Sequence, residues 1–253
     1  MLGFRGGLVF GGALLSLGWL GVSHRPGPAA PSLAISKAAP ELASHHGVEV
    51  KLSRLMRTLP RARRLRHAAL EQTLPSGVLA FGDHLVLCPR MRVANAPAAD
   101  ADGALRDFAV LRNVSGVTLS ADPTRGACLS SAFGVRGGRM HKGIDLYAAE
   151  GGPILAAGDG VVVERKYRND YGNMLLIDHG NGVFTRYAHL SRFAADDVVG
   201  AHVRAGQVLG LMGATAGYRI PVHLHYEVLL GDYDNPRGSF GLTPRSIFDY
   251  PPA

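Results

Sequence analysis

The chain has 253 residues, 47% of them hydrophobic, which suffices for one sizeable domain with an appendage or for two small domains. Its 33 glycines favour a turn-rich β fold over a helical bundle. The formal net charge is +7, but residues 129–253 carry 12 Lys and Arg against 12 Asp and Glu. The basic character therefore belongs to the N-terminal part, and it does not indicate a nucleic-acid-binding protein.

Residues 1–23 are typical of a targeting segment. Arg5 precedes an uncharged, mostly apolar run over residues 6–23, which suits a signal peptide and is marginal in length for a membrane span. We expect export to the periplasm or cell envelope, with this run either cleaved as a signal peptide or kept as an anchor in the inner membrane. Residues 24–40 are rich in Pro, Ala and Ser, as expected of a linker.

Residues 41–77 predict a short, basic helical region that Pro60 interrupts. Apolar residues recur at helical spacings of four and three: Val48, Leu52, Leu55 and Leu59. Seven basic residues and no acid lie within residues 51–70. This pattern fits a solvated basic face, and alternatively a contact with anionic membrane or cell-wall polymer.

Residues 78–125 predict a small β region, either regulatory or an extension of the following sheet. Short apolar runs separated by Gly, Asp and Pro indicate its strands: 78–81, 85–87, 108–111 and 117–119. The position of the N-terminal region before the remaining domain leaves an inhibitory role open.

The chain has two cysteines, Cys88 and Cys128. In an oxidising compartment they could form a disulfide. The closed loop of about 40 residues would contribute roughly 3–4 kcal/mol of stability in the chain-entropy treatment. Two unrelated buried thiols are the alternative.

Residues 126–253 predict a β domain with almost no helical pattern. Strands are expected at residues 161–164, 173–178, 183–188, 207–212 and 224–230. The Asn181-Gly182 pair suits a tight hairpin turn, because both residues tolerate positive φ.

Three motifs in this domain supply four histidines and one carboxylate: His141-Lys-Gly-Ile-Asp145, Tyr187-Ala-His189-Leu and His223-Leu-His225. Catalytic zinc sites use three such protein ligands. Gly143 permits a bend that lets His141 and Asp145 approach one ion, while residues two apart on a strand face the same side. Each motif alone is weak in a chain with 11 histidines, but their combination is hard to produce by chance.

The motifs and their order resemble the lysostaphin-type (LytM-like) zinc endopeptidases of bacterial cell walls. The resemblance covers residues 131–228 and includes Ser131-Ala-Phe-Gly-Val-Arg136, Ala205-Gly-Gln-Val-Leu-Gly210 and His223-Leu-His-Tyr-Glu227. It implies a mainly β fold with an antiparallel sheet of the LytM peptidase (duplicated hybrid motif) type. It also implies zinc ligands and catalytic histidines: His141, Asp145 and His225 as ligands, His189 and His223 as catalysts. The residues alone do not decide which of His223 and His225 binds the metal.

The resemblance implies hydrolysis of peptide cross-links in peptidoglycan. The alternative is a non-enzymatic cell-wall-binding regulator that activates another hydrolase. Residues 217–222, just before the last motif, depart from the family pattern, and substrate preference could differ there. His179 and His202 are expected to be structural and exposed, respectively, and Glu227 either supports a ligand or is a surface carboxylate. The bond that is cut and the oligomeric state stay open.

Overall fold

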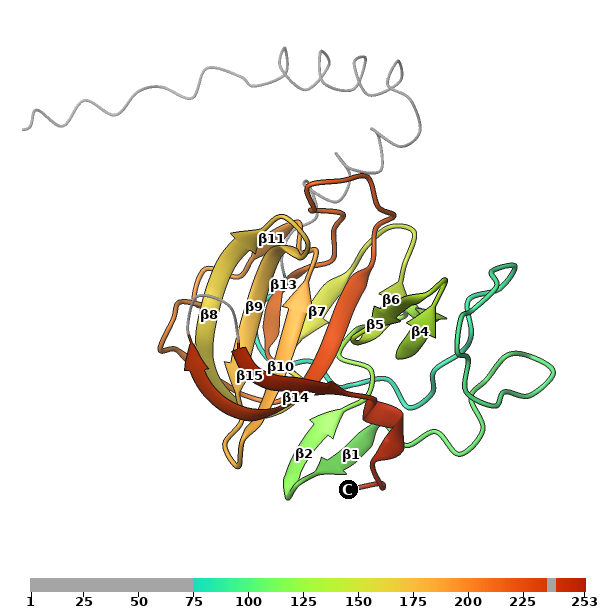
Figure 1. The fold of residues 1–253 in the computed structure, drawn as a ribbon, viewed down its shortest axis with the longest axis horizontal. Coiled ribbons are helices and arrows are strands. Elements are labelled where there is room, and N and C mark those ends of the chain that lie inside the picture. Colours follow the sequence, from blue (N-terminus) through green and yellow to red (C-terminus); the bar gives the residue numbers. More distant parts are fainter. Residues whose placement is uncertain (1–74, 236–239) are drawn as a thin grey trace, which may run out of the picture. The chain divides into compact units, whose positions relative to one another are not determined.

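The computed structural model describes residues 75–235 and 240–253, which fall within one compact unit, Val48–Ala253. Its centre is an antiparallel sheet with the strand order β12-β8-β9-β10-β14-β6-β3, and β15 pairs with the second half of β14 (Figure 1). The predicted mainly β fold is therefore confirmed. The strands of this sheet are β3 Cys128–Ser131, β6 Ile144–Tyr147, β8 Gly160–Arg168, β9 Gly172–Asp178, β10 Val183–Ala188, β12 His202–Val203, β14 Leu224–Asn235 and β15 Phe240–Arg245.

Smaller elements surround the large sheet. A three-stranded sheet has the order β11-β13-β7, and two hairpins pair β1 with β2 and β4 with β5. Their bounds are β1 Leu111–Val114, β2 Val117–Ser120, β4 Gly134–Arg136, β5 Arg139–His141, β7 Pro153–Leu155, β11 Arg192–Phe193, β13 Val208–Leu211 and a 3₁₀ turn η1 Ile247–Asp249. Across residues 75–235 and 240–253, no helix has the length and apolar character that crossing a membrane requires.

The strands of the large sheet alternate between two faces. On β14, Tyr226 enters the main core together with Tyr187 of β10, whereas His225 and Glu227 point to the opposite face. Short apolar runs of β9 and β10 are buried on both faces, because a second cluster that includes Met174 covers the other side. The polar side chains Asp145, His225 and Glu227 therefore share a face of the sheet with this second cluster.

The turn between β9 and β10 has the predicted conformation. Asn181 and Gly182 have φ values of 53° and 68°, which allow the tight reversal. His179 is held between the carbonyl of Asp159 and the hydroxyl of Thr185, so its role is structural, as predicted. His202 is exposed at the start of β12, also as predicted.

The region before β3 differs from its prediction. The runs 78–81 and 85–87 form isolated bridges rather than strands, because each meets single residues of other segments, such as Val78 with Gln207. The run at 108–111 ends where β1 begins, and only 117–119 coincides with a strand, β2. Cys88 and Cys128 form the predicted disulfide. The predictions for residues 1–23 and 24–40, and for most of 41–77, lie outside the described residues.

Candidate active site

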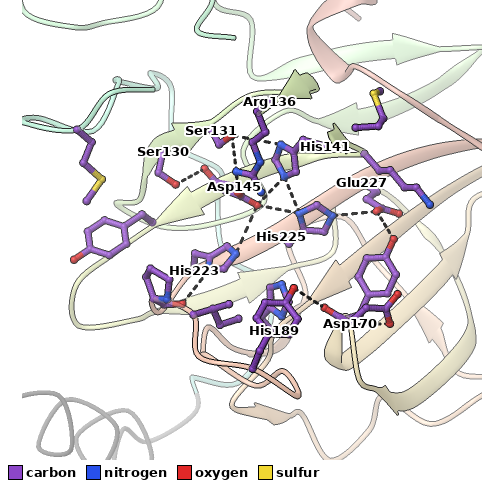
Figure 2. Close-up of a pocket in the computed structure, with 18 residues that line it drawn as sticks. Ser130, Ser131, Arg136, His141, Asp145, Asp170, His189, His223, His225 and Glu227 are labelled. Carbon is purple, nitrogen blue, oxygen red and sulfur yellow. Dashed lines mark hydrogen bonds and ion pairs between the residues drawn. The ribbon is translucent and has the colours of Figure 1, made fainter. Parts of the chain in front are cut away.

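Two neighbouring strands bring three polar side chains to one point. Asp145 on β6 and His225 on β14 are direct cross-strand partners, and His141 ends β5 just before β6. The Nε2 atom of His141 lies 3.0 Å from Asp145 Oδ1 and 3.1 Å from His225 Nδ1. His225 Nδ1 lies 2.9 Å from Asp145 Oδ1, and all three residues are buried (Figure 2).

Gly143 allows β6 and β14 to come close enough for Asp145 and His225 to meet. The reason differs from the predicted bend. A Cβ atom built on Gly143 would overlap the backbone carbonyl of Tyr226, which pairs with Ile144 across the sheet. The φ of Gly143 is not in the left-handed region, so close packing of the two backbones, rather than an unusual conformation, requires glycine here.

The outer hydrogen bonds determine what these rings present to the site. His141 Nδ1 lies 2.8 Å from the carbonyl of Ala132, and His225 Nε2 lies 3.0 Å from Glu227 Oε1. Because a carbonyl and a carboxylate can only accept, each outer nitrogen carries the hydrogen. The inner nitrogens therefore direct lone pairs at each other and at Asp145, an arrangement that needs a positive charge between them.

The donor set fits a zinc ion. Tetrahedral zinc with bonds of about 2.0–2.1 Å would separate its donor atoms by roughly 3.3 Å, close to the observed spacing. Burial opposes charging of His225, but hydrogen bonds to Asp145 and Glu227 outweigh it and raise its pKa to about 9. The surroundings thus favour a cation at this position, either a proton or a metal ion.

Two more histidines lie beside the triad. His189 follows β10 with a left-handed φ of 66°, and its Nδ1 donates to the carbonyl of Thr215 at 3.0 Å. His223 Nδ1 donates to the carbonyl of Pro221 at 2.9 Å, and its Nε2 lies 3.6 Å from Asp145 Oδ1. Figure 2 shows both rings beside the triad. Their centres are 4.7 Å apart, and each ring uses Nδ1 for its hydrogen bond to a backbone carbonyl.

Burial keeps both of these rings neutral. Desolvation, reinforced by the neighbouring His223, lowers the pKa of His189 to about 4. Desolvation also lowers the pKa of His223, although Asp145 partly offsets it. At neutral pH each ring can accept a proton at Nε2.

Glu227 is a buried support for His225, which decides between the two predicted alternatives. It is fully buried on the site face of β14 and forms an ion pair with Arg186, its cross-strand partner on β10. Tyr171 donates to Glu227 Oε1 at 2.7 Å, and Arg186 donates to the Tyr171 hydroxyl at 3.1 Å. The carboxylate is thus fixed from three sides, so it holds the ring of His225 in one orientation.

The five predicted site residues lie around an open cavity of about 530 Å³. One wall carries Arg136, which donates to Asp145 Oδ2 at 2.9 Å and to the hydroxyl of Ser131 at 2.8 Å. The cavity is also lined by Tyr218, Ile220 and Pro221, from the loop whose sequence departs from the family pattern.

Sequence reasoning assigned no role to Arg136, Arg186 or Tyr171. Arg136 lies in the first segment of the resemblance, but its position offers no chemical signal. Arg186 lies one residue before Tyr187 of the second motif, and it pairs with Glu227 once β10 is aligned with β14. Because this alignment is a tertiary feature, the sequence alone does not reveal the pair.

The fold and the site define an antiparallel β domain with three converging residues that could hold a metal ion and with two adjacent imidazoles. Residues 139–236 match the profile of Peptidase family M23, so the chain carries a domain of this family of metallopeptidases. This confirms the predicted resemblance.

Curated relatives agree with the family match. The DD-carboxypeptidase/endopeptidase Mpg of Neisseria meningitidis serogroup B is 42% identical over 115 residues, which are 43% of this chain and 26% of the relative. The peptidoglycan DD-endopeptidase ShyC of Vibrio cholerae is 43% identical over 100 residues, 39% of this chain and 22% of the relative. The chain therefore spans about a quarter of the length of these relatives.

A solved structure is also similar. The catalytic domain of the antimicrobial peptidase lysostaphin from Staphylococcus simulans has a TM-score of 0.41 and 26% identity. The match covers 49% of this chain and 90% of that domain.

Proposed function

We propose that the protein is an exported zinc metalloendopeptidase that hydrolyses peptide cross-links of bacterial peptidoglycan. The convergence of His141, Asp145 and His225 beside two neutral imidazoles carries this proposal. The names of the curated relatives, a DD-carboxypeptidase/endopeptidase and a peptidoglycan DD-endopeptidase, supply the substrate class.

In this proposal His141, Asp145 and His225 hold the metal. A bound zinc ion would supply Lewis-acid polarisation of a carbonyl and would acidify water. Glu227 and the carbonyl of Ala132 hold the two ligand rings in the tautomers that binding requires.

His189 and His223 divide the proton transfers. Each commits Nδ1–H to a backbone carbonyl, which leaves Nε2 to accept the proton of the attacking water. Once protonated, the same nitrogen can donate a hydrogen bond to the negative charge that develops on the scissile carbonyl oxygen.

Purified sacculi incubated with the full chain test the function. We expect one zinc per chain by elemental analysis and newly released peptide ends by mass spectrometry. His141→Ala should lose both the zinc and the products. Stoichiometric zinc without any cleavage, together with stimulated cleavage by a second hydrolase, would favour the regulator instead.

Export is part of the proposal. The Cys88–Cys128 disulfide supports it, because such bonds persist mainly in oxidising compartments. Mass spectrometry of the N-terminus of the cell-envelope form would distinguish a cleaved signal peptide from an anchor. Recovery of the protein only in the cytoplasm, with free thiols, would contradict export.

A further inference from the structure

A segment before the family match runs beside the metal centre. Residues 86–95 lie along β3: the amide of Leu129 donates to Val86 and the amide of Cys88 donates to Leu129, both at 2.9 Å. Further along, the amide of Ala132 donates to the carbonyl of Ala94, also at 2.9 Å. The Cys88–Cys128 disulfide joins the two stretches covalently.

The far end of this segment is connected to a proposed metal ligand through two hydrogen bonds of Ala132. Ala132, whose amide is bound to Ala94, is the residue whose carbonyl accepts the Nδ1–H of His141. Asn95 donates from Nδ2 to the carbonyl of Val135 at 3.2 Å, and the next residue, Arg136, donates to Asp145. Two of the three proposed ligands therefore rest on backbone that residues 86–95 hold in place.

The middle of the segment, at Met91, forms part of the cavity wall. The amide of Met91 donates to the carbonyl of Cys88 at 3.3 Å, closing a turn directly after the disulfide. The Met91 side chain is 44% exposed and lines the cavity together with Ser130 and Tyr147. A flexible apolar side chain at this position can contact an apolar part of a bound peptide.

We propose that residues 86–95 are a positioning segment of the active site, held by the Cys88–Cys128 disulfide. Ala94 and Asn95, at the end of this segment, hold His141 and Asp145 in place for the metal. Met91 contributes to substrate binding. The first role concerns metal affinity alone; the second rests on the proposed peptidase function. Both roles predict that loosening the segment weakens the site, the opposite of what an inhibitory segment would do.

The positioning role is tested by measuring the zinc affinity of the full chain in competition with a chromogenic chelator. The double variant Cys88→Ser/Cys128→Ser should bind zinc about 10-fold more weakly, the lower end of the effect of losing support around a ligand. Asn95→Gly should weaken binding severalfold with the disulfide intact. Glycine adopts the left-handed φ of 56° at this position without strain, so the variant loses only the side-chain donor.

Substrate contact is tested with Met91→Ala and a matched control. Val198→Ala removes a similarly exposed apolar side chain, 52% exposed, that does not line the cavity. Met91→Ala should raise KM for a soluble cross-linked peptide dimer about 3-fold or more, with unchanged zinc affinity and kcat. Val198→Ala should leave all three unchanged.

Parent-like zinc affinity in a folded double cysteine variant would overturn the positioning role. If that variant does not fold, parent-like affinity in Asn95→Gly overturns it. Faster turnover of either variant at unchanged zinc affinity would also overturn it and favour inhibition. If the parent binds zinc but cuts no peptide, the proposed function fails while zinc affinity still decides the positioning role. In that case the Kd of the same peptide dimer tests Met91. If Met91→Ala binds the dimer with the same Kd as Val198→Ala, Met91 does not contact the substrate.

Discussion

His225 and Glu227 lie two residues apart on β14, and Nε2 of the imidazole lies 3.0 Å from Oε1 of the carboxylate. This contact makes His225 present Nδ1 to the site, whereas His141 presents Nε2. The difference follows from the strand, since Glu227 occupies the same face as His225 and can only accept a hydrogen bond.

Glu227→Ala should destabilise the protein and the metal site together. Removing the carboxylate leaves Arg186 buried without its ion-pair partner, which costs about 3–5 kcal/mol in the free energy of unfolding. Zinc affinity should fall about 10- to 100-fold, because His225 loses its orienting partner. Urea denaturation and zinc competition measure the two effects.

Asp170→Asn is the control for that variant. Asp170 forms a pair with Arg168 at 3.1 Å on the rim of the same cavity, and its side chain is 58% exposed. A surface pair of this kind contributes less than about 1 kcal/mol. Equal losses in the two variants would refute the special role of Glu227.

His189→Ala should keep zinc and lose turnover. The ring lies beside the triad, but its Nδ1 is bound to Thr215 and it is not among the three converging donors. We expect kcat to fall about 10²- to 10⁴-fold, the usual contribution of an acid or base, with zinc stoichiometry unchanged. A fully active variant in a peptide-release assay would remove His189 from the mechanism.

Gly143→Ala should abolish zinc binding or prevent folding. The added methyl group would overlap the carbonyl of Tyr226 and push β6 away from β14, separating Asp145 from His225. Gly82→Ala is the matched control, because a Cβ there meets nothing closer than 3.8 Å and the φ is ordinary. Zinc titration and thermal unfolding of both variants check the prediction, which fails if Gly143→Ala behaves like Gly82→Ala.

Asp197, which lies outside the active site, should make the free energy of unfolding depend on pH. Burial, only partly offset by Arg165, raises its pKa to about 7, against 3.8 for an ordinary aspartate. Between these values the folded state keeps a proton that the unfolded state releases, so stability falls as pH rises from about 4 to 7 and then levels off.

Asp197→Asn should flatten this slope, whereas the same change at its exposed neighbour Asp196 should not. Denaturant unfolding at several pH values, with zinc removed, measures both variants. A slope that Asp197→Asn leaves intact would assign the dependence to other groups.

Local sequence determined much of the site, because strand alternation and motif spacing are local properties. The two-residue spacing of His223 and His225 brings both rings to the cavity, although β14 begins only at Leu224. The Asn181-Gly182 turn follows from the φ that these residues tolerate. The disulfide could also be predicted from the sequence, because the chain has only two cysteines and they form one pair. Short runs such as 78–81 were misread as strands, because a strand requires a partner that the run itself does not reveal.

Only the tertiary structure decided how the site is supported. Ala132 and Arg136, which contact His141 and Asp145, each lie nine residues away along the chain. The partners of Glu227 come from more distant segments: Arg186 is 41 residues away and Tyr171 is 56 residues away. Gly143 owes its identity to a backbone 83 residues further on, at Tyr226. Composition and spacing do not encode the cross-strand register that creates these contacts. The sequence thus supplied the residues proposed for the site, and the register of the sheet decided which atoms they present.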